Sequence, residues 1–180
     1  RIDRIVQNFL EFSRTPKLRV EPCHLGGVVQ SVLKLLEYRL KEYNVEVSFS
    51  FDPDVSEVPV DPDRIREALI NLITNACEAM NEGGHIDIRE EHGEDIDLGL
   101  VATLTVKDYG GGISEDLVHK VTTPFFTTKE DGSGLGLSIV ERIVKEHRGK
   151  LIIISDPGRS TEFSMVLPKK RGGDESDPDH

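Results

Sequence analysis

The segment from residue 61 to 80 constrains the fold most, because it marks both ends and both faces of one helix. Asp61-Pro62 is a strong helix start, since aspartate caps the free amides of a first turn and proline suits its first position. Gly83-Gly84 then stops the helix. Apolar residues recur at helical spacing and predict one buried side, made of Ile65, Leu69, Leu72, Ile73, Ala76 and Met80.

The opposite side of this helix carries an unusual set of polar residues. Glu67, Asn71, Asn75 and Glu78 follow one another at spacings of 4, 4 and 3, which places them on one face. Asparagine is a poor helix former in mid-helix, and its amide oxygen is a hard ligand of the kind that Mg²⁺ accepts. The pattern alone is as consistent with a solvated helix face as with a metal site.

The rest of the chain alternates helical and strand patterns. Apolar spacing predicts a helix over 1–14, ended by Pro16, and a second helix over 25–43. The remaining expected elements are strands at 45–51, 86–89, 98–106, 151–154 and 163–167, helices at 114–121 and 135–147, and loops at 52–59 and 122–134. Helices on one face of a mixed sheet bury this order well, which predicts an α/β (α+β) two-layer sandwich.

Composition excludes several classes of function. The formal net charge of -11 opposes a nucleic-acid role, because phosphate backbones require clustered basic residues. Hydrophobic residues make up 37% of the chain, which is enough for a core, yet no apolar run approaches the roughly 20 residues of a membrane span. Cys23 and Cys77 have no metal-ligand spacing, and Cys77 is expected to be buried. The first residue is Arg1, so we expect a fragment of a longer protein.

Two glycine-rich segments are candidates for ligand binding. Asp108-Tyr-Gly-Gly-Gly-Ile113 follows a predicted strand, and its glycines allow the backbone to approach a flat ligand. An aspartate there can accept a hydrogen bond from an exocyclic amine such as that of adenine; the alternative is a glycine turn with a capping Asp. Gly132-Ser-Gly134-Leu-Gly136-Leu opens a helix, whose free amides favour phosphate, although a lone glycine pattern is a weak signal.

A fourth segment lies between these two. Pro124-Phe-Phe-Thr-Thr-Lys129 carries two phenylalanines in a polar loop. They either anchor the loop on a partner surface or pack on the core. Lys129 is expected to reach phosphate oxygens as a point charge.

Taken together and in order, the four segments resemble the catalytic domain of sensor histidine kinases, in the superfamily of gyrase, Hsp90, histidine kinases and MutL. The family's N box matches Asn71-Leu-Ile-Thr-Asn75-Ala, and its two glycine boxes match Asp108-x-Gly110-x-Gly112 and Gly132-x-Gly134-x-Gly136-Leu. Its F box matches 124–129, in a form most similar to the nitrogen-regulatory sensor kinases. The resemblance covers residues 20–168 and implies the Bergerat ATP-binding fold, with about three helices on one face of a mixed sheet.

This resemblance implies ATP and Mg²⁺ as cofactors and assigns roles to residues. Asp108 binds the adenine amine, Asn75 ligates Mg²⁺ with Asn71 beside it, and the catalytic set is Asn71, Asn75 and Lys129. The implied ATP contacts are Asn71, Asn75, Glu78, Ala79, Asp108, Gly110, Gly112, Ile113, Thr127, Thr128, Lys129, Gly132, Ser133, Gly134, Leu135, Gly136, Leu137 and Thr161.

The resemblance also implies an organisation and partners. Residues 1–18 are similar to the end of the second helix of a dimerisation and histidine-phosphotransfer bundle, 19–169 form the catalytic ATP-binding domain, and 170–180 are an acidic tail expected to be disordered. None of the six histidines has the context of a phosphoacceptor. The implied partners are that bundle, a response-regulator receiver domain and a second copy in the full-length protein, without nucleic-acid or membrane contact by this domain. The implied location is cytoplasmic, with a parent protein that is soluble or anchored in the inner membrane.

The implied function is delivery of the γ-phosphate of Mg-ATP to a histidine of the bundle, for onward transfer to a response-regulator aspartate. Related ATPases typically carry glutamate at the position of Asn71, and asparagine cannot act as a general base, which favours a kinase. The alternatives are an ATPase or an anti-sigma-type serine kinase on this fold, and a non-catalytic ATP-responsive module.

Three residues depart from the family pattern. Glu78 stands where many sensor kinases carry a basic residue that contacts phosphate, Ser160 stands where glycine usually precedes Thr161, and Arg148 stands at a common glycine. Lys129 is expected to take over the phosphate contact.

Overall fold

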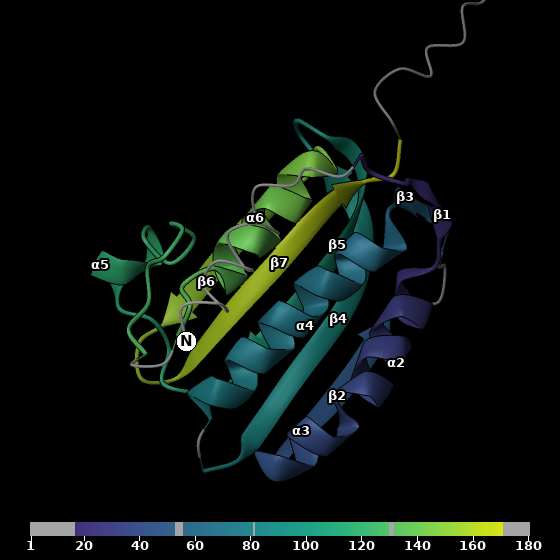
Figure 1. Ribbon diagram of the computed structural model, residues 1–180. Coiled ribbons are helices and arrows are strands. Elements are labelled where there is room, and N and C mark those ends of the chain that lie inside the picture. Colours follow the sequence, from purple (N-terminus) through teal and green to yellow (C-terminus); the bar gives the residue numbers. More distant parts are fainter. Residues whose placement is uncertain (1–16, 53–55, 81, 130–131, 171–180) are drawn as a thin grey trace, which may run out of the picture.

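A mixed five-stranded sheet forms one layer of the structure, and helices form the other (Figure 1). The computed structural model describes residues 17–52, 56–80, 82–129 and 132–170. In chain order the elements are β1 (Glu21–Cys23), α2 (Leu25–Leu35), α3 (Glu37–Glu42), β2 (Val45–Phe51), β3 (Val58–Val60), α4 (Pro62–Ala79), β4 (Gly84–Asp95), β5 (Gly99–Asp108), α5 (Glu115–Val118), α6 (Gly136–Glu146), β6 (Lys150–Asp156) and β7 (Ser160–Pro168).

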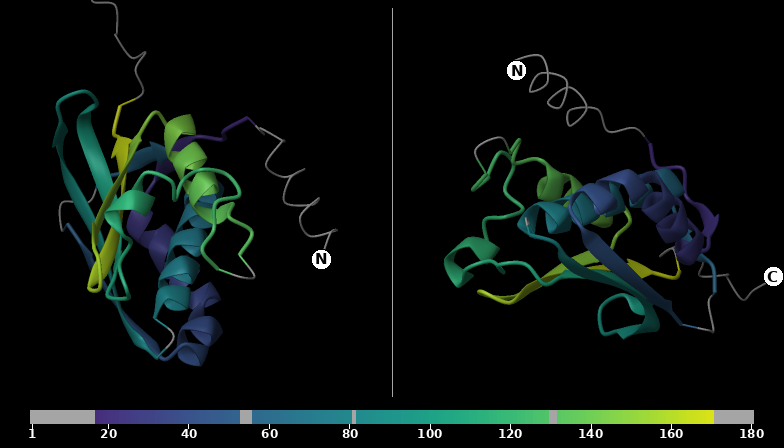
Figure 2. Two further views of the ribbon diagram at one scale, coloured as in Figure 1. Left: turned by 90° about the vertical axis from the view of Figure 1, so that its left-hand side faces the viewer. Right: turned by 90° about the horizontal axis from the view of Figure 1, so that it is seen from below.

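The sheet has the order β2-β4-β5-β7-β6, in which β2 and β4 run parallel and the other neighbours run antiparallel. Helices α2, α3, α4 and α6 all lie on one face of it, as the edge-on views show (Figure 2). The predicted two-layer sandwich is therefore confirmed. The core lies between the layers, and its largest fully buried side chains include Leu25, Ile65, Leu69, Leu72, Ile73, Ile86, Ile88, Leu104, Ile143, Met165 and Leu167.

Helix α4 forms as the sequence predicts. The Asp61 side chain accepts hydrogen bonds from the backbone amides of Asp63 at 3.1 Å and Arg64 at 3.2 Å, which caps the first turn. The Asp61 amide donates to Nε2 of the buried His147 at 2.9 Å, and the amide of Arg19 donates to Asp61 Oδ2 at 2.8 Å. This cap therefore also ties α4 to the end of α6 and to the segment before β1. All six residues of the predicted apolar side are buried.

Two expectations about the N-terminal half are wrong. The helix expected over 25–43 is broken at Leu36, which has φ -91° and ψ 4°. Helix α2 buries four side chains fully and α3 buries none, so the first part of the apolar stripe is in the core, whereas Leu36 and Leu40 pack against it only partly buried. The expected loop at 52–59 contains the start of β3, which pairs with β1 in a separate two-stranded sheet. Pro22 opposite Pro59 disguises these short strands, because proline is depleted in strands.

Other boundaries differ by smaller amounts. Strand β4 continues to Asp95, so the charged hairpin is mostly strand, and α5 covers only Glu115–Val118 of the helix expected over 114–121. The helix predicted over 1–14 and the tail predicted at 172–180 lie outside the described residues. Within the described ranges, no helix is long and apolar enough to cross a membrane.

We expect Asp61→Ala to lower the free energy of unfolding by about 1–2 kcal/mol, because it removes both the cap of α4 and the acceptor for Arg19. Asp63→Ala is the matched control, since Asp63 lies in the same turn and forms only an exposed ion pair with Arg66, which predicts a loss of roughly 0.5 kcal/mol. Urea unfolding measures both variants. Equal losses would show that the cap contributes nothing beyond surface charge.

Candidate functional site

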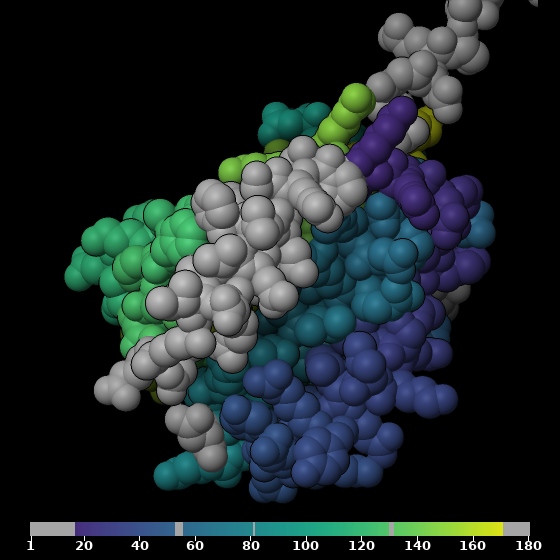
Figure 3. Space-filling view, viewed as in Figure 1, coloured from purple at the N-terminus to yellow at the C-terminus, as the bar shows by residue number. Residues whose placement is uncertain are grey.

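One cavity of about 1140 Å³ collects the polar face of α4, the loop after β5, the segment 122–134 and the start of α6. In Figure 3 the green part of the chain around this segment forms one flank of the molecule. Every ATP contact implied by the sequence lines this cavity except Gly110. The lining contacts are Asn71, Asn75, Glu78, Ala79, Asp108, Gly112, Ile113, Thr127, Thr128, Lys129, Gly132, Ser133, Gly134, Leu135, Gly136, Leu137 and Thr161.

The two asparagines of α4 face the beginning of α6. The side-chain amide of Asn71 donates to the carbonyl oxygen of Glu67 at 2.9 Å, which orients the group. A Cβ atom at Gly136 would lie 3.0 Å from Asn71 Oδ1 and 3.7 Å from Asn75 Nδ2. Glycine at this position therefore lets α6 begin directly against both amides, so its free backbone N–H groups adjoin them.

Asp108 ends β5, lines the same cavity and is only 5% exposed. Its Oδ1 accepts the amide of Gly110 at 3.0 Å, and among the described residues its Oδ2 accepts no hydrogen bond. Burial raises the pKa of this carboxyl group above its ordinary value, against the lowering effects of the Gly110 amide and Lys129. Thr161 is its direct neighbour on β7 and is 4% exposed. A buried carboxylate with a free oxygen requires a donor, such as an exocyclic amine.

The glycine loop after Asp108 packs against the turn between β6 and β7. Gly112 has a φ of +64°, and a Cβ atom there would lie 2.3 Å from the carbonyl oxygen of Asp156. The amide of Gly158 donates to Gly111 at 2.7 Å, and the amide of Ile113 donates to Ser155 Oγ at 2.7 Å. These contacts fix the loop beside Asp108, so Gly110 supports the site although it does not line the cavity.

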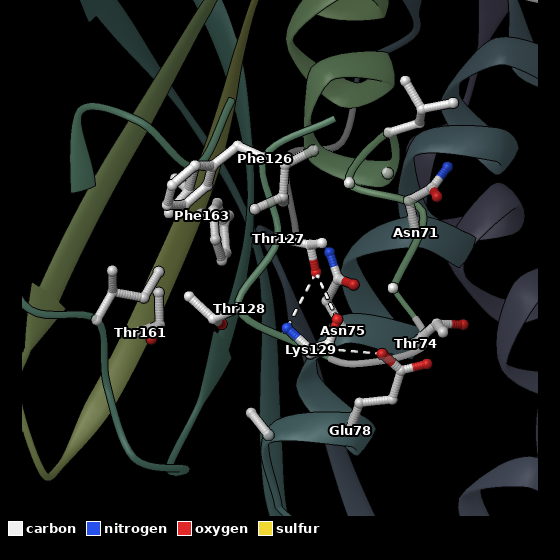
Figure 4. A pocket seen from close by; sticks show the side chains of 18 of the residues that line it. Asn71, Thr74, Asn75, Glu78, Phe126, Thr127, Thr128, Lys129, Thr161 and Phe163 are labelled. Atoms are coloured by element: carbon white, nitrogen blue, oxygen red, sulfur yellow. Dashed lines mark hydrogen bonds and ion pairs between the residues drawn. The ribbon is translucent and has the colours of Figure 1, made fainter. Parts of the chain in front are cut away.

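The two phenylalanines of the segment 122–134 have different surroundings. Phe126 lines the cavity on the side of Phe163, whereas Phe125 is 53% exposed (Figure 4). Phe125 has a φ of +67° and its amide donates to Gly134 at 2.8 Å. A Cβ atom at Gly134 would lie 2.4 Å from the backbone of Phe125, so the close approach of these two parts of the loop requires glycine.

Lys129 and Glu78 meet across the cavity (Figure 4). Lys129 Nζ donates to Glu78 Oε2 at 2.6 Å, and Arg39 of α3 donates to the other oxygen, Oε1, at 3.2 Å. Lys129 is thus an ion-pair partner of Glu78 in this structure, and the acidic residue that departs from the family pattern lies between two cations.

Sequence reasoning missed several residues of the cavity wall, namely Arg64, Thr74, Ser114, Leu117, Val121, Ile139, Arg142 and Phe163. It named Gly111 and Phe126 only within their segments and Glu67 only on the polar face. A signal for two of the missed residues was available. Arg64 precedes Asn71 by seven residues on α4, and Arg142 follows Leu135 by seven residues at α6, which in each case is two turns along one helix face.

The donor set suits a metal ion that arrives with its own oxygen ligands. Among the described residues, no group of three or more His, Cys, Asp or Glu side chains is placed to hold a metal ion. The amide oxygens of Asn71 and Asn75 are neutral hard donors, and Mg²⁺ commonly takes few protein ligands beside substrate phosphates. The site therefore fits Mg²⁺ bound together with a polyphosphate, and does not resemble a metal cage made by protein alone.

Comparison with known proteins shows the family and the fold of the chain. The family described as "Histidine kinase-, DNA gyrase B-, and HSP90-like ATPase" matches residues 60–171. Sporulation kinase E of Bacillus subtilis (strain 168) is 30% identical over 175 residues, which are 97% of this chain and 23% of that protein. The chain thus spans about a quarter of that relative's length.

Solved structures of histidine kinases share the fold. The catalytic domain of histidine kinase ThkA is 34% identical with a TM-score of 0.71, over 84% of this chain and 96% of that domain. A structure of ThkA in complex with the response regulator protein TrrA has 32% identity and a TM-score of 0.76, over 94% of this chain and 47% of that one. Full-length ShkA in complex with AMPPNP has 26% identity and a TM-score of 0.80, over 92% of this chain and 35% of that one.

Alanine substitutions at two neighbouring glycines test whether the contacts between the loop after β5 and the β6–β7 turn stabilise the chain. We expect Gly112→Ala to cost about 1–3 kcal/mol of stability, because alanine is strained at positive φ and its Cβ would collide with Asp156. Gly111→Ala is the matched control, because Gly111 has no atom within 4 Å of its Cβ position and no positive φ. Melting temperatures of the nucleotide-free chains provide the comparison. Equal shifts in the two variants would contradict the packing described above.

Proposed function

The chain belongs to the family of histidine kinase-, DNA gyrase B- and HSP90-like ATPases, and within it to the catalytic domains of histidine kinases. We therefore propose that it binds Mg-ATP in the α4–α6 cavity and delivers the γ-phosphate to a histidine of a phosphoacceptor bundle. One observation supports this most directly. The buried Asp108 carboxylate and the amides of Asn71 and Asn75 line a single cavity, with Asp108 near the end of α4 at Ala79 and the two amides against the start of α6. Such a site offers an acceptor for a base near Asp108 and metal ligands near the start of α6.

Adenine binds at the Asp108 end in this proposal. The exocyclic amine donates to Asp108 Oδ2, which has no acceptor role elsewhere in the described structure, while Gly110 holds Oδ1. Thr161 stands beside Asp108 and contacts the base directly or through water. The raised pKa of Asp108 supports this assignment, because a ligand donor offsets part of the cost of a buried charge.

The phosphates bind at the other end, against α4 and the start of α6. The first amides of α6 point into this region and carry the positive end of the helix dipole, which attracts phosphate. Asn75 holds Mg²⁺ with Asn71 beside it, and the ion when bound neutralises phosphate charge. Lys129 adds a flexible positive charge from the facing segment.

The carboxylates at this end favour kinase over ATPase. Glu67 Oε2 accepts from Arg64 at 2.7 Å, and Glu78 is paired with Lys129 and Arg39. Among the described residues of the cavity, each carboxylate near the asparagines is therefore held by a cation and poorly suited to activate water. Asn71 itself cannot take a proton. The site can still position the nucleotide and neutralise the charge of its phosphates. Phosphoryl transfer to an external nucleophile requires these two contributions.

The same proposal includes the partners of a longer protein. Residues 1–18 belong to a dimerisation and phosphoacceptor helix bundle of a homodimer, 19–169 are the catalytic domain and 170–180 are a tail. A response-regulator receiver domain takes the phosphate from the bundle histidine; the ThkA–TrrA complex supports such a partner. A cytoplasmic location suits a domain that uses ATP and keeps Cys23 and Cys77 as free thiols.

The metal assignment predicts different behaviour for the two asparagines. Asn75→Ala removes the metal ligand, so we expect the effect of Mg²⁺ on ATP affinity to fall by roughly tenfold or more. Asn71→Ala weakens binding but retains most of the Mg²⁺ effect, because Asn75 remains as the metal ligand and Asn71 only lies beside it. Titration with ATP in Mg²⁺ and in a chelator measures both. A larger loss of the Mg²⁺ effect in Asn71→Ala would reverse the assignment.

The reaction itself is tested with ATP labelled in the γ-phosphate. We expect the 180-residue chain to bind the nucleotide, to release phosphate at close to the background rate and to remain unlabelled, because none of its six histidines has a phosphoacceptor context. Rapid phosphate release would support the ATPase alternative, and phosphoserine on a partner protein would support the serine-kinase alternative. Label incorporated into the chain would sink the prediction of a separate acceptor.

A further inference from the structure

Glu78 is a carboxylate in the part of the cavity that would receive phosphate, and its two oxygens accept hydrogen bonds from different parts of the chain. Oε2 accepts from Lys129 of the 122–134 segment at 2.6 Å, and Oε1 accepts from Arg39 of α3 at 3.2 Å (Figure 4). The Glu78 side chain is 31% exposed and lines the cavity, whereas Arg39 does not line it. One oxygen can therefore lose its partner while the other keeps its partner.

The two cations are held in different ways. Lys129 is anchored at its backbone, whose amide donates to Thr127 Oγ1 at 3.1 Å, while its side chain is a flexible stem that is 43% exposed. The Arg39 guanidinium also lies over the Tyr43 ring, 5.8 Å from its centroid, which supports it independently of Glu78. Lys129 can thus change partner by rotating its side chain alone, and Arg39 remains in place.

Electrostatic repulsion requires Lys129 to change its partner from Glu78 to the phosphates when a nucleotide binds. A carboxylate close to a polyphosphate repels it, and an ammonium group bonded to that carboxylate is not free to bind phosphate. We propose that Glu78 competes with the nucleotide phosphates for Lys129, and that Arg39 is the positioning residue that stays with Glu78 and neutralises it once Lys129 has turned to the phosphates. This inference rests on the proposed function, because it takes Mg-ATP as the ligand of the cavity.

Because Lys129 must leave Glu78 before it can bind phosphate, the chain binds ATP more weakly than it would if Lys129 had no carboxylate partner. Glu78→Gln removes the competing charge and is expected to tighten Mg-ATP binding by roughly two- to fivefold, a range appropriate to a partly exposed ion pair. Most other roles of Glu78, as a contact of the nucleotide or of the metal, predict weaker binding in the same variant. The sign of the change therefore separates the inference from these alternatives.

Calorimetric titration of single and double variants tests it. The gain in Glu78→Gln should disappear in the Lys129→Met background, because no ammonium group is left to be released. Adenosine has no phosphates, so its affinity should be the same for the native chain and Glu78→Gln. Glu37→Gln is the matched control: it makes the same charge change and breaks a pair of the same 2.6 Å length, Glu37 with Lys41, outside the cavity. It should leave Mg-ATP affinity unchanged.

Arg39 is tested by the same cycle. Among the residues that the structure describes, Arg39→Met leaves Glu78 with Lys129 as its only cation, so Mg-ATP binding should weaken by roughly two- to fivefold. The loss should vanish when Glu78→Gln is also present.

The outcomes separate this inference from the proposed function. Unchanged or weaker Mg-ATP binding by Glu78→Gln overturns the inference alone, and so does a gain that survives Lys129→Met or appears equally with adenosine. A native chain that does not bind Mg-ATP overturns the proposed function together with the inference.

Discussion

The packing of α4 is the constraint on which the site depends. Its apolar side is buried against the sheet and the neighbouring helices, from Ile65 and Leu69 to Ile73, and burial of such side chains contributes about 1.5–3 kcal/mol each. This side determines how the helix is rotated about its axis. The opposite side, with Asn71 and Asn75, must then face the cavity. The cap at Asp61 sets where the helix begins, so the axial position of the asparagines is determined as well.

Close backbone contacts complete the cavity around this helix. Gly136 brings α6 against Asn71, Gly134 brings the 122–134 segment against itself at Phe125, and Gly112 presses the loop after Asp108 onto Asp156. In each case a side chain would require the backbone to move. The glycines therefore shape the site because no side chain fits at their positions, and the proposed function assigns the chemistry to few polar groups: the Asp108 carboxylate, the two amides and the charges around Glu78.

The elements that carry this chemistry were predictable because local signals and burial agree in them. The N-cap, the apolar stripe of α4 and the strand patterns flanking the glycine loops all led to the observed structure. The β1–β3 pairing escaped because two three-residue strands containing Pro22 and Pro59 have no local signature. The break at Leu36 escaped because α3 continues the helical spacing, and Leu36 and Leu40 still pack against the core although they are only partly buried. Within the site, the Arg39–Glu78 contact joins residues that are 39 positions apart, so only the fold reveals it.

In the proposed function, this cavity recognises adenine through Asp108 and holds the nucleotide with Mg²⁺. We would test this first by calorimetric titration of the native chain and Asp108→Asn with ATP, with and without Mg²⁺. Because burial raises the pKa of Asp108, ionisation of this group costs stability as the pH rises through that pKa, so asparagine should not lower the melting temperature at neutral pH. We expect micromolar, Mg²⁺-dependent binding by the native chain and none by a fully folded Asp108→Asn. A native chain that does not bind ATP, or a variant that binds it equally well, would show that Asp108 does not recognise adenine in this cavity.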